Sequence, residues 1–149
     1  MELRITNIIE ELVERIASLY RQNLNNSRAS GKLQDFQTYI DLNDQRFLIS
    51  FELEDYWKYV EYGRKSGKMP PISAIEDWIR VKPVIPDSTS GRIPDTRQLA
   101  FLIARKIGRD GTPPQLPLKR TIESPETDSL LNLIKQEIIQ QVKTYIEEQ

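Results

Sequence analysis

Two long amphipathic segments, one near each end of the chain, restrict the folds that this sequence can adopt. Apolar residues recur at steps of three and four from Ile5 to Leu24, and again from Leu130 to Ile146. Each segment is predicted to form a helix whose apolar stripe packs on a sheet. A helix on a membrane surface is the alternative for the first segment. Such helices carry a Lys/Arg-rich polar face, whereas this one is acidic.

Residues with terminating and capping preferences mark the ends of these two helices. Asn25, Asn26 and Ser27 weaken the first pattern, and Ser30–Gly31 closes it. Ser124 is suited to cap the second helix, and Pro125 fits its first helical position. The second helix is therefore expected to start at Pro125 and to run to about Glu147.

Two segments of alternating hydrophobicity follow the first helix and predict an antiparallel hairpin. The turn between them is expected at Asn43–Asp44–Gln45, because these residue types favour turns. One face of the hairpin is expected to pack on the first helix. The residues on the apolar parity are Phe36, Thr38, Ile40 and Leu42 in the first strand and Phe47, Ile49, Phe51 and Leu53 in the second.

The middle of the chain predicts two loops and shorter helices. A helix from Tyr56 to Tyr62 is ended by Gly63, and a loop excursion covers about residues 64–71. Ser73 is expected to cap a helix that runs to about Arg80, with Ile75, Trp78 and Ile79 turned inward. A second, proline-containing excursion covers about residues 81–94.

The next predicted helix starts at Asp95 or Thr96 and is stopped by Gly111 and the prolines that follow it. Its expected apolar stripe is Leu99, Ala100, Leu102, Ile103 and Ile107. Residues 1–149 are thus predicted to form a single α+β domain: a small antiparallel sheet packed by long N- and C-terminal helices, with two shorter helices and long loops in the middle.

Charge is distributed unevenly along the chain. Residues 62–120 contain 12 Lys/Arg and 5 Asp/Glu, a balance of +7, whereas residues 1–61 and residues 121–149 are each at −4. Such a distribution suits head-to-tail contact between copies or a basic surface that faces a polyanion. The plain alternative is that the loops carry solvated lysines and arginines.

Residues with the usual catalytic and metal-binding chemistry are few. The chain has no Cys and no His, so thiolate metal sites, disulfides and histidine general bases are excluded. Its glycines match neither nucleotide-binding fingerprint. The acidic clusters, Asp41 with Asp44 and Glu52 with Glu54 and Asp55, are interpreted as a solvated hairpin edge and a helix start. We therefore expect a protein that is not an enzyme and that needs no cofactor or metal.

No apolar run approaches the length of about 20 residues that a membrane span needs, and no membrane partner is expected. The N-terminal residues lack the continuous apolar region of a signal peptide. A cytoplasm-like compartment is expected.

The middle of the chain contains Tyr56 followed by the run Tyr59–Val60–Glu61–Tyr62–Gly63. This pattern resembles the Tyr-x-x-Tyr-Val-Glu-aromatic-Gly element of tailed-bacteriophage neck proteins of the tail-completion or head–tail joining family. Similar stretches follow at 72–79 and 99–107, then Gly111–Thr112–Pro113–Pro114 and a proline-rich hinge at 115–118. The chain departs from the family at Leu116–Pro117–Leu118, where Pro-Phe-Leu is expected.

The resemblance implies a structural virion protein that self-associates into a ring in the neck, between portal and tail, and that is present in the host cytoplasm during assembly. Its partners would be portal or adaptor and tail proteins, with possible non-specific contact to packaged DNA. The loops would dock to neighbouring rings. The candidate interface residues are Arg64, Lys65, Lys68, Met69, Arg92, Arg105, Lys106 and Arg109.

A nucleic-acid-binding module that uses the basic segment 62–120 is the alternative from another class. The aromatic residues Trp57, Tyr59 and Tyr62 beside Arg64, Lys65 and Lys68 would support it, if their rings are exposed to stack on bases. A corner of the core is the ordinary role of such an aromatic cluster. A generic adaptor without a phage role is a third alternative.

Overall fold

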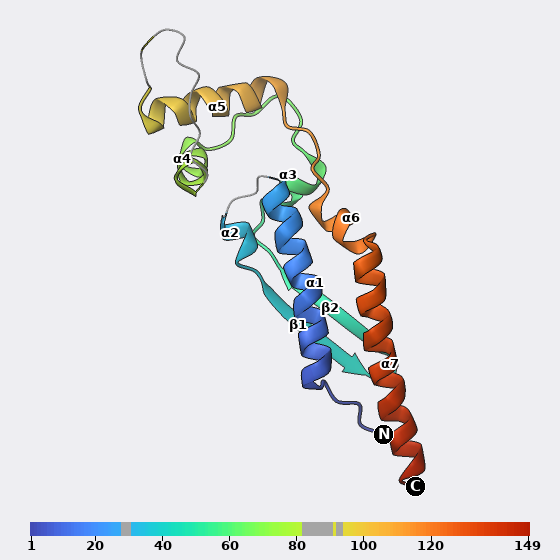
Figure 1. Cartoon of the computed structure of the whole chain (residues 1–149). Helices are drawn as coiled ribbons and strands as arrows, with labels where there is room; N and C mark the ends of the chain where they lie inside the picture. The colour runs from blue at the N-terminus through green and yellow to red at the C-terminus, as the bar shows by residue number, and fades with distance from the viewer. Residues whose placement is uncertain (28–30, 82–90, 92–93) are drawn as a thin grey trace.

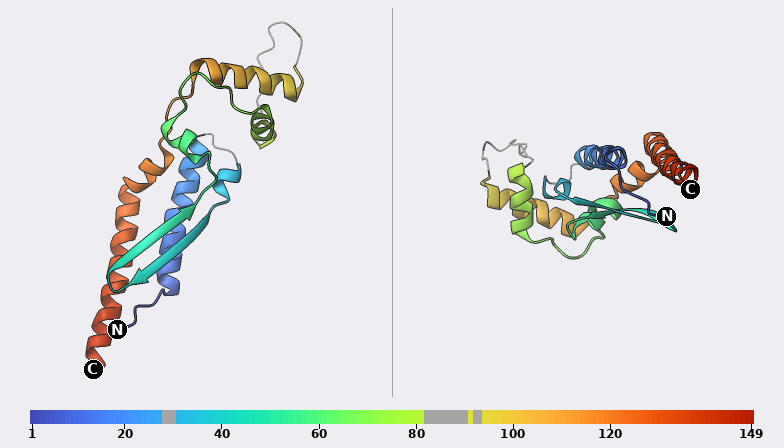
Figure 2. Two further views of the ribbon diagram at one scale, coloured as in Figure 1. Left: turned by 180° about the vertical axis from the view of Figure 1, so that it is seen from behind. Right: turned by 90° about the horizontal axis from the view of Figure 1, so that it is seen from below.

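The computed structural model describes residues 1–27, 31–81, 91 and 94–149. The predicted α+β class is confirmed: a two-stranded antiparallel hairpin is covered by the N- and C-terminal helices. The hairpin consists of β1 (Gln37–Asn43) and β2 (Arg46–Glu52). The covering helices are α1 (Asn7–Asn26) and α7 (Pro125–Glu147), and both lie on the same face of the hairpin (Figure 2).

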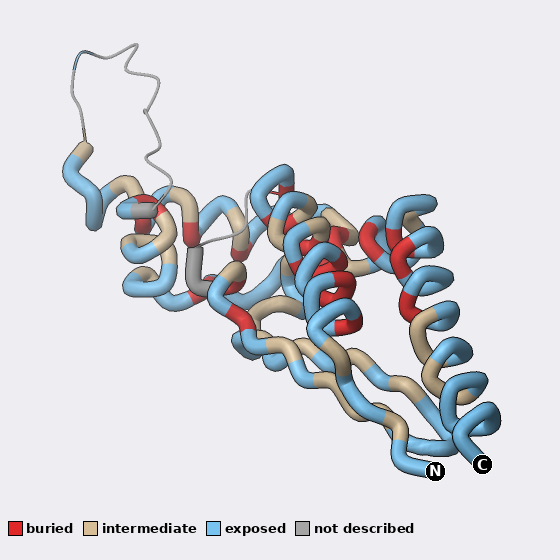
Figure 3. The backbone as a smooth tube through the Cα atoms, turned by 60° about the horizontal axis from the view of Figure 1, so that its bottom comes forward, coloured by how far each residue is buried: buried red, intermediate tan, exposed pale blue. Residues whose placement is uncertain are grey.

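Helix α1 begins where the sequence changes from an extended segment to the amphipathic pattern. The side chain of Thr6, in extended conformation, accepts a hydrogen bond from the Ile9 amide and caps the helix. Along α1, buried residues follow the predicted spacing, and they include Ile9, Val13 and Ile16. Figure 3 shows buried positions gathered along α1 and the first half of α7.

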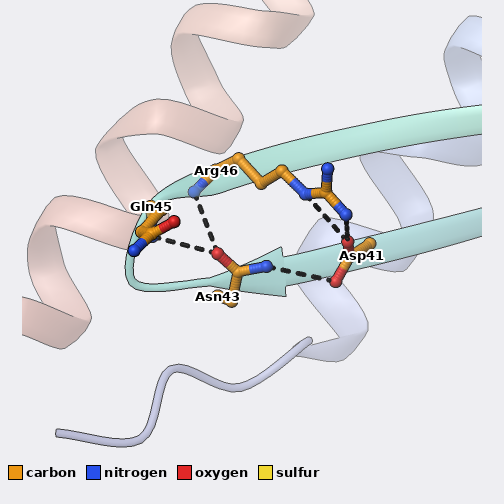
Figure 4. A network of polar contacts seen from close by, with 4 residues as sticks. All are labelled: Asp41, Asn43, Gln45 and Arg46. Atoms are coloured by element: carbon orange, nitrogen blue, oxygen red, sulfur yellow. Dashed lines mark hydrogen bonds and ion pairs between the residues drawn. The ribbon is translucent and has the colours of Figure 1, made fainter.

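In the hairpin Ile40 lies opposite Ile49 and Leu42 opposite Phe47, so the two predicted apolar parities pair with each other. Asn43 closes the turn through its side-chain oxygen, which accepts hydrogen bonds from the amides of Gln45 at 3.0 Å and Arg46 at 3.1 Å (Figure 4). Arg46 also pairs with Asp41 at 2.7 Å. Both side chains of this ion pair are well exposed, so the pair stabilises the hairpin by at most about 1 kcal/mol.

Two apolar clusters form the core. The first joins α1 to α7 through Ile9, Leu12, Val13, Ile16, Leu130 and Ile134, and the inner face of the hairpin packs on it. The second lies at the C-terminal end of α1, where Tyr20, Phe36 and Phe51 have ring centroids 5.0 to 5.6 Å apart. A short helix that the sequence analysis missed, α2 (Gly31–Gln34), contributes Leu33 to this second cluster.

The remaining helices lie towards and beyond the C-terminal end of α1 (Figure 1). Helix α3 (Trp57–Tyr62) ends at Gly63, as predicted. Helices α4 (Ile72–Val81) and α5 (Thr96–Asp110) pack against each other and stand away from the hairpin and α7 in both views. Helix α6 (Pro117–Ile122) then leads into α7.

Three local predictions in this region are wrong. Ser73 does not cap α4, because the helix already begins at Ile72 and Ser73 lies within its first turn. The buried side of α5 consists of Ala100, Ala104 and Gly108, whereas Leu102, expected in the stripe, is exposed. At Gly108 the backbone of Met69 approaches so closely that a Cβ atom would lie 3.2 Å from its N and Cα atoms, which favours glycine there.

The third wrong prediction concerns residues 115–118, which were expected to be a hinge. Residues 117 and 118 instead form the first turn of α6, because Pro117 is in a first-turn position that tolerates proline. The predicted excursion at 81–94 mostly lies outside the described residues.

Candidate interaction surface

The segment that contains α4 and α5 projects from the rest of the molecule (Figure 1). We call residues 63–112 the arm and the rest of the described chain the body. The root is the place where arm and body meet, and it consists of the two crossing segments 60–64 and 111–116. At the root the outgoing and returning chains are antiparallel. Arg64 and Thr112 exchange backbone hydrogen bonds of 3.0 and 2.8 Å. The amides of Gln115 and Leu116 donate to the carbonyls of Val60 and Glu61.

Two glycines allow the chains to approach this closely at the root. Gly63 and Gly111 have φ angles of 75° and 72°, and residues other than glycine rarely adopt such positive φ values. A Cβ atom at Gly63 would overlap the Thr112 carbonyl oxygen, and one at Gly111 would overlap the Arg64 carbonyl oxygen. The glycines of the two motif segments thus face each other's backbone.

Glu61 joins the root to the body. Its side chain is buried, with 3% of its surface exposed, and its two oxygens accept hydrogen bonds from the amides of Leu118 at 2.8 Å and Lys119 at 3.0 Å. These amides belong to the first turn of α6, which has no side-chain cap of its own. Glu61 therefore caps α6 from a distant part of the sequence, and the N-terminal end of the helix stabilises its charge.

The charge of Glu61 also affects Tyr20. Burial, and secondarily the negative charge of Glu61, raise the pKa of the Tyr20 hydroxyl from 10.0 to about 12. Tyr20 belongs to the second core cluster, so the root and the body core are electrostatically coupled.

The loop at 64–71 is tied to α5. The Gly67 amide donates to the Gly108 carbonyl at 2.6 Å, and the Met69 side chain lies against Gly108 so closely that a Cβ atom there would be 2.7 Å from Met69 Cγ. Arg64 donates to the Lys68 carbonyl at 3.1 Å and lies over the Tyr59 ring at 5.0 Å. The structure therefore brings the candidate loop residues next to the last turns of α5.

The candidate interface residues have different environments. Lys65, Lys68, Arg105 and Lys106 are exposed, whereas Arg64 is half-buried at the root. Arg109 is exposed but bonds Asp110 through two contacts of 2.8 and 3.0 Å, and this contact lowers the pKa of the Asp110 carboxyl. Met69 stands partly exposed on the arm. Arg92 lies outside the described residues.

The aromatic residues of 56–62 were considered either as a corner of the core or as a platform for base stacking, and the structure divides them between these two environments. Tyr56, Trp57 and Val60 pack on the second core cluster, as a corner of the core would. Tyr59 and Tyr62 are exposed, Tyr62 by 67%, and the Arg64 guanidinium lies on the Tyr59 ring. Helix α3 therefore presents two rings to solvent beside the basic loop.

The outer face of α5 was not identified from the sequence. Phe101 and Leu102 are 43% and 47% exposed. By helical spacing, Phe101 lies at the edge of the buried side, in line with Gly108, and Leu102 lies on the side opposite to Ala100 and Ala104. The cations Arg105, Lys106 and Arg109 are on the same side. We call these five residues the α5 face. The sequence analysis placed Leu102 in the apolar stripe with Leu99, Ala100, Ile103 and Ile107 and left Phe101 out of it.

A groove on the body was also missed. It is open to solvent, has a volume of about 550 Å³ and lies between the inner side of β2, α1, α6 and the start of α7. Ile122 and Leu131 line it although they are 61% and 41% exposed. The other lining residues are Ile16, Ile49, Phe51, Leu53, Trp57, Leu118 and Thr127. Because α6 forms one wall, the groove could not be predicted without that helix.

The acidic clusters do not converge. Asp41 pairs with Arg46, and Glu52 accepts a hydrogen bond of 2.8 Å from the Tyr39 hydroxyl. Among residues 1–27, 31–81, 91 and 94–149, no group of three acidic side chains is arranged to hold a metal ion. In the same part of the chain, no helix has both the length and the apolar character that a membrane crossing requires.

Comparison with known protein families, with curated proteins and with solved structures finds no match to this chain.

Proposed function

We propose that this protein is a structural component of the phage neck, which assembles as a ring between portal and tail and acts in tail completion or head–tail connection. The observation that carries the proposal is the arm and its root. The two segments that resemble the neck family, 59–63 and 111–114, meet in space and hold a basic arm away from an acidic body.

This geometry suits a subunit that contacts a neighbour. The root is fixed by backbone hydrogen bonds and by two glycines, so the arm has a defined direction. The arm exposes cations and large apolar side chains together, a combination typical of protein interfaces. On this proposal the protein has no catalytic role and its partners are further copies, portal or adaptor proteins, and tail proteins, in the virion and in the host cytoplasm during assembly.

Electron microscopy of the purified protein, alone and mixed with the portal of the same phage, tests this proposal. We expect rings with a central channel, at least in the presence of the portal. If the protein remains monomeric in both samples over the accessible concentration range, the proposal is wrong.

A second candidate, nucleic-acid binding, is favoured by the exposed rings of Tyr59 and Tyr62 beside Arg64, Lys65 and Lys68. Stacking of bases on these rings would be sensitive to their removal, and contacts from the lysines would weaken with salt. Fluorescence anisotropy with single- and double-stranded DNA at increasing salt measures both effects. Absence of binding at low salt would exclude this candidate.

A further inference from the structure

We propose that the α5 face of one copy docks into the body groove of a second copy. This inference rests on the proposed ring and names the contact that would build it. It is argued from the two surfaces, from their separation within one chain and from their charges.

The α5 face has the composition of a docking element. Phe101 and Leu102 are large, apolar and about half exposed. Leu102 lies among cations on the side of the helix that turns away from Gly108 and Met69, and Phe101 lies at the edge of that side. The capping box at Asp95 and Gln98 fixes the start of the helix, with contacts of 2.8 and 3.3 Å. The two apolar side chains are thus presented by a well-defined helix.

The body groove matches such an element in size and chemistry. Its lining is apolar, and a cavity of about 150 Å³ is sufficient for a benzene ring. A groove of about 550 Å³ therefore has room for an aromatic and an aliphatic side chain together. Docking would remove the exposed parts of Ile122 and Leu131 from water, which is favourable at about 25 cal/mol per Å².

The two surfaces cannot meet within one chain in the observed arrangement. The arm stands beyond the C-terminal end of α1, whereas the groove lies beside α1, α6 and the start of α7 (Figures 1 and 2). The root holds the arm in this direction through the Arg64–Thr112 pairing and the Glu61 cap. An α5 face that occupies the groove would therefore come from a second copy of the chain.

Charge complementarity favours this occupant. The described arm contains 8 Lys/Arg and 4 Asp/Glu, a balance of +4, whereas the described body contains 10 Lys/Arg and 17 Asp/Glu, a balance of −7. Carboxylates outnumber cations next to the groove lining. The exposed charged neighbours of lining residues in the sequence are five carboxylates, Glu52, Glu54, Glu123, Glu126 and Asp128, against three cations, Arg15, Lys58 and Lys119. An arm with Arg105 and Lys106 beside its apolar pair would meet an acidic rim.

An arm-to-groove contact joins different surfaces of the two copies. Such a head-to-tail contact propagates until the rotation between neighbours closes a ring. A contact that used the same patch on both copies would stop at a dimer. The inferred contact therefore explains how one chain can supply every interface of a ring.

Variants in the groove and on the α5 face test the inference. We expect Leu131→Glu and Leu102→Glu each to raise the concentration at which half of the protein is assembled by about tenfold or more. Leu133→Glu is the matched control, because Leu133 lies on the same helix as Leu131 with 45% exposure but does not line the groove. Circular dichroism would confirm that each variant is folded, and light scattering would measure assembly.

Mixing the two defective variants distinguishes this contact from other interfaces. The Leu131→Glu protein retains its α5 face and the Leu102→Glu protein retains its groove, so an equimolar mixture should form a dimer and nothing larger. A mixture that remains monomeric, or variants that assemble like the unmodified protein, would overturn the arm-to-groove contact. Rings of the unmodified protein would still support the proposed neck function in that case.

Cross-linking provides a second, independent measurement. The chain has no Cys, so Leu102→Cys with Ile122→Cys introduces the only thiols. We expect mild oxidation with diamide to link separate copies into a ladder, and Leu102→Cys with Leu133→Cys to give none. Absence of the ladder at assembling concentrations would contradict the inference. If the unmodified protein does not assemble, with or without portal, the proposed function fails as well.

Discussion

At the scale of single residues, Glu61 shows how a buried charge can stabilise the root of the arm. Its carboxylate is removed from water, which is costly, but two backbone amides of α6 satisfy it. The same contact satisfies amides that would otherwise be unpaired at a helix start. One side chain therefore links α3, which leads into the arm, to α6, which follows it.

We expect Glu61→Gln to lower the free energy of unfolding by about 1–3 kcal/mol, because an amide offers one acceptor where two are needed and loses the charge. Urea denaturation monitored by tryptophan fluorescence would measure the change. Glu54→Gln is a suitable control, since Glu54 is exposed, and it should change stability by less than about 0.5 kcal/mol. Equal effects of the two substitutions would contradict the capping role.

Tyr20 makes the stability of the body dependent on alkaline pH. Its folded-state pKa of about 12 lies above the unfolded value of 10.0, so the folded state favours the neutral hydroxyl. The associated stability is fully present below pH 10 and is lost as the pH rises towards 12. We expect a loss of about 2 kcal/mol over this range, and urea midpoints measured at several pH values would show it.

Tyrosine-to-phenylalanine variants identify the source of this alkaline loss. Tyr20→Phe should remove most of it. The pKa of Tyr39 is also raised, by its hydrogen bond to Glu52, but Tyr39 is exposed on the outer face of the hairpin. Tyr39→Phe should therefore leave most of the pH dependence in place, and the opposite ranking would contradict the role of Tyr20.

At the scale of elements, the root depends on two glycines, and their substitution separates backbone strain from steric overlap. Gly63, Gly91 and Gly111 have similar positive φ angles, but a Cβ atom at Gly91 meets no described atom within 4 Å. Gly91→Ala should lower the free energy of unfolding by about 1 kcal/mol, the cost of the backbone strain alone. Gly63→Ala and Gly111→Ala should destabilise by clearly more, because they also force the crossing chains apart.

Urea denaturation and hydrogen exchange would measure this difference. Hydrogen exchange should show faster exchange at the amides of Arg64 and Thr112 in the two root variants. If all three alanine variants have the same stability, the close approach of the crossing chains is not the reason why glycine is required at Gly63 and Gly111.

The sequence predicted those elements whose signals are local. The stripes of α1 and α7, the Asn43 turn and the Ser124 cap each depend on residues within a few positions of one another. Helix α6 was missed because its cap, Glu61, is 57 residues from Leu118 in the sequence. The groove was missed with it. Ala100 was predicted on the buried side of α5, but Ala104 and Gly108 were missed. The spacing of hydrophobic residues carries no signal for a glycine such as Gly108, which is buried against Met69.

At the scale of the whole molecule, the separation of a basic arm from an acidic body gives the protein a directional field. Between about 0.1 M and about 1 M salt, the Debye length falls from about 10 Å to about 3 Å. If the arm of one copy meets the body of another, self-association should weaken over this range. Light scattering at fixed protein concentration would measure it.

A matched variant shows whether this salt effect comes from the arm. Arg105 and Lys106 are exposed on the α5 face, so their replacement by Gln should weaken association at low salt and flatten its salt dependence. Replacement of Lys143, an exposed cation near the end of α7, by Gln serves as the control. It should change neither the association at low salt nor its salt dependence. Association that strengthens with salt in the unmodified protein would show that apolar contact alone drives it.

The fixed root also has a consequence for curvature. A stiff arm transmits its angle to whatever it touches, and the turn between one copy and the next follows from that angle. A small change at the crossing of Arg64 and Thr112 would be repeated at every step around a closed assembly. If copies join through the arm, the number of copies in the assembly would be encoded in a few backbone torsions next to two glycines, far from the contact surfaces themselves.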